Sequence, residues 1–135
     1  MNQDHKPIVR VKDVMRDKFE IIDGFTTVAD AIRQFKATGS KALIVKRRNA
    51  DDEFGIVLLS DIAKKVLGKD CAPERVNVYE IMSKPLLSVP PDMDIRYCVR
   101  LFENFGISIA PVMENREVIG TVRYDELVLI GMLRD

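Results

Sequence analysis

The pattern of apolar and polar positions occurs twice along this chain of 135 residues. Residues 9–15, VRVKDVM, correspond to residues 76–82, VNVYEIM, at an offset of 76 − 9 = 67 residues. At the same offset, the segment VADAIRQFKATG, which ends at Gly39, corresponds to IRYCVRLFENFG, which ends at Gly106. A repeat of this period indicates one supersecondary unit made twice.

Each copy predicts the order strand, helix, strand, strand, helix. Residues 19–22 and 86–89 are expected as the first short strands. The helix that follows has its apolar residues at positions i, i+3, i+4 and i+7, namely Val28, Ala31, Ile32 and Phe35 in one copy and Ile95, Cys98, Val99 and Phe102 in the other. Thr27 and Asp94 are expected at the N-termini of these helices, and Gly39 and Gly106 at their C-termini.

Two apolar strands with a polar turn follow each glycine, and a final helix is expected over residues 61–67 and 124–133. The pattern therefore predicts an α/β fold with repeat 1 at residues 8–67, a junction at 68–75 and repeat 2 at 76–135. A half of about 60 residues buries too little surface to be stable alone, so the two repeats are expected to form one compact module.

Charge and composition exclude several classes of protein. Lys and Arg number 21, as do Asp and Glu, so no basic field is expected to attract nucleic acid or anionic lipid. No apolar stretch suits a membrane span, and the polar start has no signal-peptide core, so cytoplasm is the expected compartment. The single histidine, His5, has no partner at metal-ligand spacing, and no nucleophile motif occurs. We expect no metal, no obligatory cofactor and no enzyme activity.

The recurring pieces V-x-[DE]-[VI]-M, an amphipathic helix ending in Gly, an apolar strand and G-h-h-x-x-x-[DE]-[IL] resemble the cystathionine-β-synthase (CBS) domain. The resemblance covers the chain from about Val9 to about Leu133 as a tandem pair, or Bateman module. It implies two β-α-β-β-α repeats packed with pseudo-twofold symmetry, with two clefts between them. In many relatives these clefts bind AMP, ADP, ATP or S-adenosylmethionine, and the modules often dimerise.

The resemblance also implies which residues meet such a ligand. The acid of the last motif, Asp61 in the first copy and Glu126 in the second, accepts hydrogen bonds from the ribose hydroxyls. Relatives carry Thr or Ser three residues earlier, toward the phosphate, whereas this chain has Leu58 and Arg123 there. Ser60 stands at another position where relatives often carry a hydroxyl.

The Asp61 cleft is expected to be the better ligand site. It keeps Ser60, whereas Glu126 has a second acid, Asp125, beside it, whose charge Arg123 offsets only in part. The family pattern takes the adenine wall of each cleft from the opposite copy, which suggests Leu87, Val89, Ile109 and Pro111 for the Asp61 cleft and Ile21, Ile22, Ala42 and Leu43 for the Glu126 cleft.

Simpler interpretations stand beside these. An acid at a helix start is stabilised by the helix dipole without any ligand, Ser60 suits an N-cap, and Arg123 suits a solvated charge. The residues thus leave two main functions open. One is a regulatory sensor of an adenosine-type molecule that acts on an unknown partner protein, and the other is a ligand-free dimerisation scaffold. Polyanion binding is a weaker third hypothesis. A homodimer is expected in either main case because the final helix is apolar on most sides.

Overall fold

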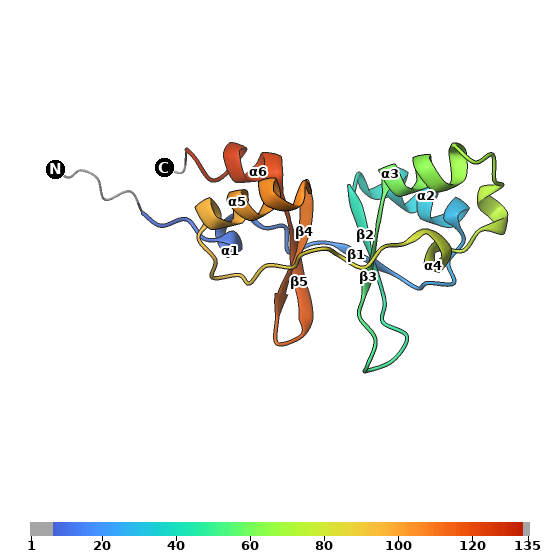
Figure 1. Ribbon diagram of the computed structural model, residues 1–135, viewed down its shortest axis with the longest axis horizontal. Helices are drawn as coiled ribbons and strands as arrows, with labels where there is room; N and C mark the ends of the chain where they lie inside the picture. Colours follow the sequence, from blue (N-terminus) through green and yellow to red (C-terminus); the bar gives the residue numbers. More distant parts are fainter. Residues whose placement is uncertain (1–6, 134–135) are drawn as a thin grey trace. The chain divides into compact units, whose positions relative to one another are not determined.

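The computed structural model describes residues 7–133, which fall into two compact units (Figure 1). The central unit is Phe19–Pro85, and the terminal unit combines Met1–Lys18 with Leu86–Asp135. These units do not coincide with the two sequence repeats, because the first helical turn of each repeat packs into the core formed by the rest of the other repeat. The repeat boundaries at 8–67 and 76–135, and the single compact module, stay predictions.

The central unit contains a three-stranded sheet in the order β1-β2-β3. β1 runs parallel to β2, and β3 runs antiparallel to β2. Its elements are β1 (Glu20–Ile22), α2 (Val28–Thr38), β2 (Ala42–Val45), β3 (Gly55–Leu58), α3 (Leu59–Ile62), a wider helical turn over Ala63–Leu67, a 3-10 turn over Pro73–Arg75, and α4 (Val78–Ile81). Both neighbouring strands pair with β2, whose four residues are all buried, which places it at the middle of the sheet.

The terminal unit contains a two-stranded antiparallel sheet, in which Ala110 lies opposite Val122. Its elements are α1 (Val11–Val14), α5 (Ile95–Phe105), β4 (Ile109–Glu114), β5 (Glu117–Arg123) and α6 (Tyr124–Leu129). The mixed α/β fold with tandem repeats is therefore confirmed. The final helices differ from expectation: α6 ends at Leu129 instead of residue 133, and α3 begins at Leu59 instead of residue 61.

The strand expected over residues 86–89 is wrong. Only Val89 pairs, in a single parallel bridge to Val112. Its N–H donates to the carbonyl of Pro111 at 3.0 Å, and its carbonyl accepts from Met113 at 2.9 Å. In a parallel ladder alternate residues donate, so the next donor along the chain would be residue 91. That residue is Pro91, which has no N–H, and the ladder stops there.

The two long helices have the predicted ends. The Thr27 hydroxyl accepts from the N–H of Asp30 at 3.1 Å, and the Asp94 carboxylate accepts from the N–H of Arg96 at 2.9 Å. Each helix ends in a glycine in the left-handed conformation, with φ of 68° at Gly39 and 64° at Gly106. Glycine is favoured there because it has no Cβ to clash.

Each unit has its own apolar core, to which the exchanged helical turn contributes. Val11 and Val14 of α1 pack with Phe102 of α5, and Val78 of α4 packs with Phe35 of α2. Backbone hydrogen bonds at equivalent positions hold both turns: the N–H of Val11 donates to Met93 and that of Val78 donates to Thr26, each at 2.8 Å.

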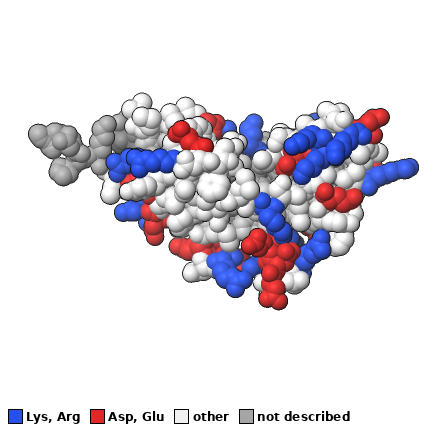
Figure 2. Space-filling model, in the orientation of Figure 1, with Lys and Arg blue, Asp and Glu red and all other residues white. Residues whose placement is uncertain are grey.

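The expectation that Cys98 belongs to the apolar stripe of its helix is confirmed by its burial. It is fully buried, as is Ala31 at the equivalent position, and burial raises the pKa of its thiol to about 11. Between residues 7 and 133 no helix has the length and apolar character needed to cross a membrane. His5 lies outside the described residues. On the face shown in Figure 2, basic and acidic side chains are interspersed.

Candidate ligand-binding site

Asp61 is the third residue of α3, which follows β3 without a loop. Its Oδ2 atom accepts the backbone N–H of Leu58 at 2.8 Å, so the side chain stabilises the start of its own helix. The side chain is half-buried, and among residues 7–133 it forms no ion pair. Because each carboxylate oxygen accepts about two hydrogen bonds, most of its acceptor capacity remains for a ligand.

Ser60 lies beside this acid and is exposed. It is not the N-cap, as one interpretation of the sequence held, because the helix already begins at Leu59 and Leu58 is the capping residue. The hydroxyl is therefore not needed to cap the helix. Its predicted contact with a phosphate group stays a prediction.

Glu126 occupies the same place in the terminal unit, as the third residue of α6 directly after β5. Its environment is different. The Nε atom of Arg16 donates to Oε2 at 3.0 Å, and the Glu126 side chain is only 9% exposed. The other oxygen, Oε1, is buried and has no hydrogen-bond partner among residues 7–133. Sequence reasoning missed Arg16, which no motif distinguished.

Arg123, just before α6, is held by Asp125. Its Nε and Nη2 atoms donate to the two oxygens of that carboxylate at 3.1 and 2.6 Å. Asp125 also accepts the N–H of Glu126 at 3.0 Å. The guanidinium expected to offset the charge of the second acid in part is thus paired with that acid.

The predicted adenine walls are divided between the units. Leu87, Val89, Ile109 and Pro111 belong to the terminal unit, and Ile21, Ile22, Ala42 and Leu43 belong to the central unit. Val89, Ile22 and Leu43 are members of the apolar core of their own unit. Since each set lies in the unit that does not contain the acid it was expected to serve, both walls stay predictions.

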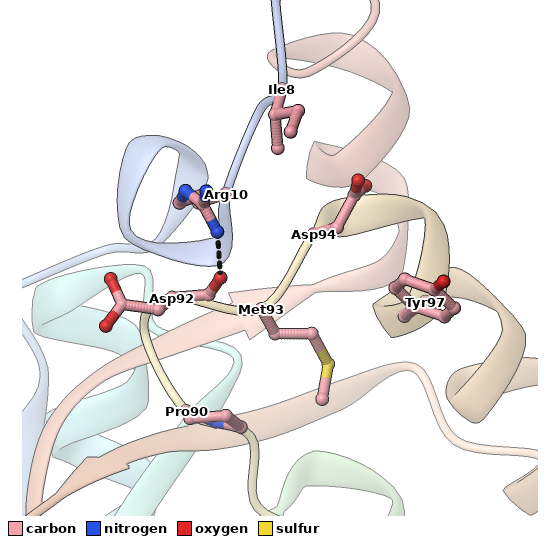
Figure 3. A pocket seen from close by; sticks show the side chains of 7 residues that line it. All are labelled: Ile8, Arg10, Pro90, Asp92, Met93, Asp94 and Tyr97. Carbon is pink, nitrogen blue, oxygen red and sulfur yellow. Dashed lines mark hydrogen bonds between the residues drawn. The ribbon is translucent and has the colours of Figure 1, made fainter.

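A shallow pocket of about 520 Å³ lies in the terminal unit, between the chain leading into α1 and the start of α5 (Figure 3). It is lined by Ile8, Arg10, Pro90, Asp92, Met93, Asp94 and Tyr97. Its charged groups are already bonded: Arg10 Nη1 donates to the Asp92 carbonyl at 2.7 Å, and the Arg96 guanidinium holds the pKa of Asp94 at about 2. Among the described residues no group of three His, Cys, Asp or Glu side chains suits a metal ion.

The model of the CBS domain family matches this chain twice, at residues 11–68 and 78–132. The chain belongs to the CBS domain family. Both acids, Asp61 and Glu126, lie inside the matched regions. The tandem pair that the family resemblance implied is therefore confirmed.

Relatives of this CBS pair include much longer proteins. Homoserine O-acetyltransferase of Methanosalsum zhilinae is 32% identical over 122 residues, which are 88% of this chain and 23% of that protein. An uncharacterized protein of Methanopyrus kandleri is 30% identical over 81 residues, or 59% of this chain and 41% of its own length. The chain thus spans less than half of each of these relatives.

Solved structures include the hexameric CBS-CP12 protein from bloom-forming cyanobacteria, at 33% identity and a TM-score of 0.84, with 90% of this chain and 67% of that chain covered. The CBS domain pair of protein MJ0100 is 21% identical with a TM-score of 0.79, covering 93% and 97% of the two chains. That pair was solved in complex with 5′-methylthioadenosine and S-adenosyl-L-methionine. At this identity the likeness shows the fold.

Proposed function

We propose that this chain is a regulatory CBS pair that binds an adenosine-containing molecule through Asp61 and passes the bound state to a partner protein. The ligand is AMP, ADP, ATP or S-adenosylmethionine, and the pair itself performs no catalysis. Signalling of this kind needs only a ligand with different affinities for two conformations.

The observation that carries the proposal is the state of the Asp61 carboxylate. It is half-buried at the acid position of the family motif, bonded to one backbone N–H and to no cation among residues 7–133. A carboxylate so placed accepts both vicinal hydroxyls of a ribose through charge-assisted hydrogen bonds. The MJ0100 pair, which shares the fold, holds two adenosine-type molecules, and this supports the same ligand class here.

Self-association is a second part of the proposal, and exposed apolar side chains support it. Leu129, Met132 and Leu133, at and beyond the end of α6, are 74%, 70% and 86% exposed. Exposed apolar side chains clustered in this way favour a protein interface. The expected assembly is a homodimer, and light scattering at micromolar concentration tests it, since a mass that stays monomeric contradicts it. Should the chain dimerise without binding any ligand, the scaffold function takes the sensor's place.

A thermal-shift screen tests ligand binding. AMP, ADP, ATP and S-adenosylmethionine are added separately to the chain, and a ligand at 100 times its dissociation constant should stabilise it by about 2.7 kcal/mol. Asp61→Ala should reduce the shift by about half or more. Asp30→Ala is the matched control, because Asp30 is the acid at the third position of α2 in the same unit. No shift with any of the four molecules, or equal loss in both variants, contradicts the proposal.

A further inference from the structure

The Glu126 position is closed by a residue from the other end of the chain. Arg16 and Glu126 are 110 residues apart in sequence, yet Nε of Arg16 lies 3.0 Å from Oε2 of Glu126. The glutamate side chain is 9% exposed and that of Arg16 is 58% exposed, so the arginine covers the acid from the solvent side.

The backbone fixes Arg16 in this place. Its N–H donates to the carbonyl of Thr121 at 2.8 Å, and its carbonyl accepts the N–H of Thr121 at 3.0 Å. Thr121 lies on β5, five residues before Glu126, so the bridge delivers the guanidinium to the start of α6.

The central unit has the same bridge with a different side chain. Ser83 and Ile56 exchange the same two backbone hydrogen bonds, at 3.0 and 2.8 Å. Ser83 follows Arg16 by 67 residues, the offset of the repeat, and Ile56 precedes Thr121 by 65, the offset that also relates Asp61 to Glu126. Where the terminal unit has a guanidinium beside its acid, the central unit has a short hydroxymethyl group.

The second carboxylate oxygen of Glu126, Oε1, indicates which chemical group of a ligand this position can accept. Oε1 is buried without a donor among the described residues, and a buried carboxylate oxygen without a donor is costly. The vicinal hydroxyls of a ribose donate as a pair to both oxygens of a carboxylate, whereas the Arg16 pair engages Oε2 alone. Oε1 of Glu126 therefore still lacks a hydrogen-bond donor, which a ribose hydroxyl would supply.

We propose that Arg16 is a specificity-determining residue that closes the Glu126 position to ribose, so that the pair takes one adenosine-type ligand, at Asp61, instead of two. A ribose reaches Glu126 only by displacing a guanidinium, which replaces a hydrogen bond between two charged groups with one from a neutral hydroxyl. The inference rests on the function proposed above, since it concerns the second position for the same ligand class.

Calorimetric titration with AMP, ADP, ATP and S-adenosylmethionine tests the closure. Wild-type protein should bind one molecule per chain, and Arg16→Ser, which copies Ser83, should bind two. Arg16→Lys keeps the positive charge and is the control, with one molecule expected. The reciprocal change, Ser83→Arg, should close the Asp61 position and weaken binding at least tenfold, while Ser83→Ala should not.

The outcomes separate this inference from the proposed function. If wild type already binds two molecules, or if neither Arg16→Ser nor the double variant described below binds a second one, the closure is overturned and the sensor function stands. If none of the proteins binds any of the four molecules, both fail. Arg16→Ser leaves a buried acid unpaired, so the double variant Arg16→Ser/Glu126→Asp, which copies the central unit at these two positions, is measured as well. Two molecules bound by a correctly folded double variant support the inference, and one overturns it.

Discussion

Asp61 of the central unit and Glu126 of the terminal unit stand at the same position of the same motif, but they are bonded to different groups. The shorter acid accepts the N–H of Leu58, three residues away, and the longer one accepts from the side chain of Arg16, 110 residues away. The additional methylene does not explain the difference by itself, because Glu80, the third residue of α4, accepts the N–H of Asn77 at the start of its own helix at 2.7 Å. A motif thus specifies where an acid lies, whereas residues outside the motif decide whether its oxygens are available to a ligand.

The exchanged helical turns show a second difference. In the terminal unit Lys12 of α1 pairs with Asp92 at 3.1 Å. The equivalent residues of the central unit, 67 positions away in each case, are Tyr79 of α4 and Phe25, whose rings meet edge to face at 5.6 Å. Since the backbone bonds beneath are the same in both units, the side chains were free to change from an ion pair to an aromatic pair.

The largest effects should come from what the units share. Phe102 and Phe35 are 1% and 4% exposed at equivalent positions of their cores. Replacing either with Ala should lower the free energy of unfolding by about 3–5 kcal/mol, because a large cavity is left. Urea denaturation followed by circular dichroism measures both. A cost below about 1 kcal/mol for one of them would show that the two cores are not equivalent.

The next largest effect should be the difference in ligand affinity between variants of the two acids. Asp61→Ala should weaken binding of an adenosine-type ligand about ten- to a hundredfold, roughly 1.5–3 kcal/mol, because a charge-assisted hydrogen bond is lost. Glu126→Ala should change affinity less, since Arg16 already occupies that carboxylate. Calorimetry on the two variants decides the ranking. A larger loss for Glu126→Ala reverses it, and no loss in either leaves Asp61 as a helix-capping acid alone.

Sequence alone sufficed where the determining contacts are local. The apolar stripe ending in Phe35, the cap at Thr27 and the left-handed glycines Gly39 and Gly106 each depend on residues within one or two helical turns, and all four were predicted. The acid Asp61 was found in the same way, from a short motif. The absence of the expected strand over residues 86–89 also has a local cause, because Pro91 has no N–H to continue the ladder. The apolar residues of this segment predicted a strand that the proline prevents.

Contacts between distant segments could not be predicted. A repeat does not say which core receives the first helical turn, and the turn of α1 packs with Phe102 of the other copy. Nor does any periodicity mark Arg16 as the partner of Glu126, because a single exposed arginine after VKDVM resembles any surface charge. Aligning the repeats places Arg16 against Ser83, which was the one signal available.

The helix caps offer a smaller contrast, which pH should expose. Thr27 caps α2 as a neutral hydroxyl, whereas Asp94 caps α5 as a carboxylate paired with Arg96 at 2.7 Å. The side-chain hydrogen bond from Arg96 lowers the pKa of Asp94 from 3.8 to about 2. Since the folded pKa is the lower one, this stabilisation is present above about pH 4–5 and is lost as pH falls toward 2.

Asp94→Ala should therefore cost about 0.5–2 kcal/mol at pH 7 and less at pH 2, whereas Thr27→Ala should cost a similar amount at both. Thermal melts at the two pH values measure the difference. A cost of Asp94→Ala that does not change with pH would show that the carboxylate caps α5 without its charge.

The smallest expected effects are the coupling energies of the side-chain pairs that hold the exchanged helical turns of α1 and α4. Their dependence on salt concentration distinguishes the ion pair from the aromatic pair. A double-mutant cycle on Lys12 and Asp92 should give about 0.2–1 kcal/mol at low salt, because both side chains are more than half exposed. At 1 M salt the Debye length is about 3 Å, so this coupling should nearly vanish.

A cycle on Phe25 and Tyr79 should give about 0.5 kcal/mol at either salt concentration, since ring contacts carry no net charge. Because Arg48 lies 5.6 Å over the Tyr79 ring, the cycle is repeated in Arg48→Ala to remove the cation from the comparison. Equal salt dependence of both cycles in that background would show that the Lys12–Asp92 coupling is no more electrostatic than the contact between the two rings.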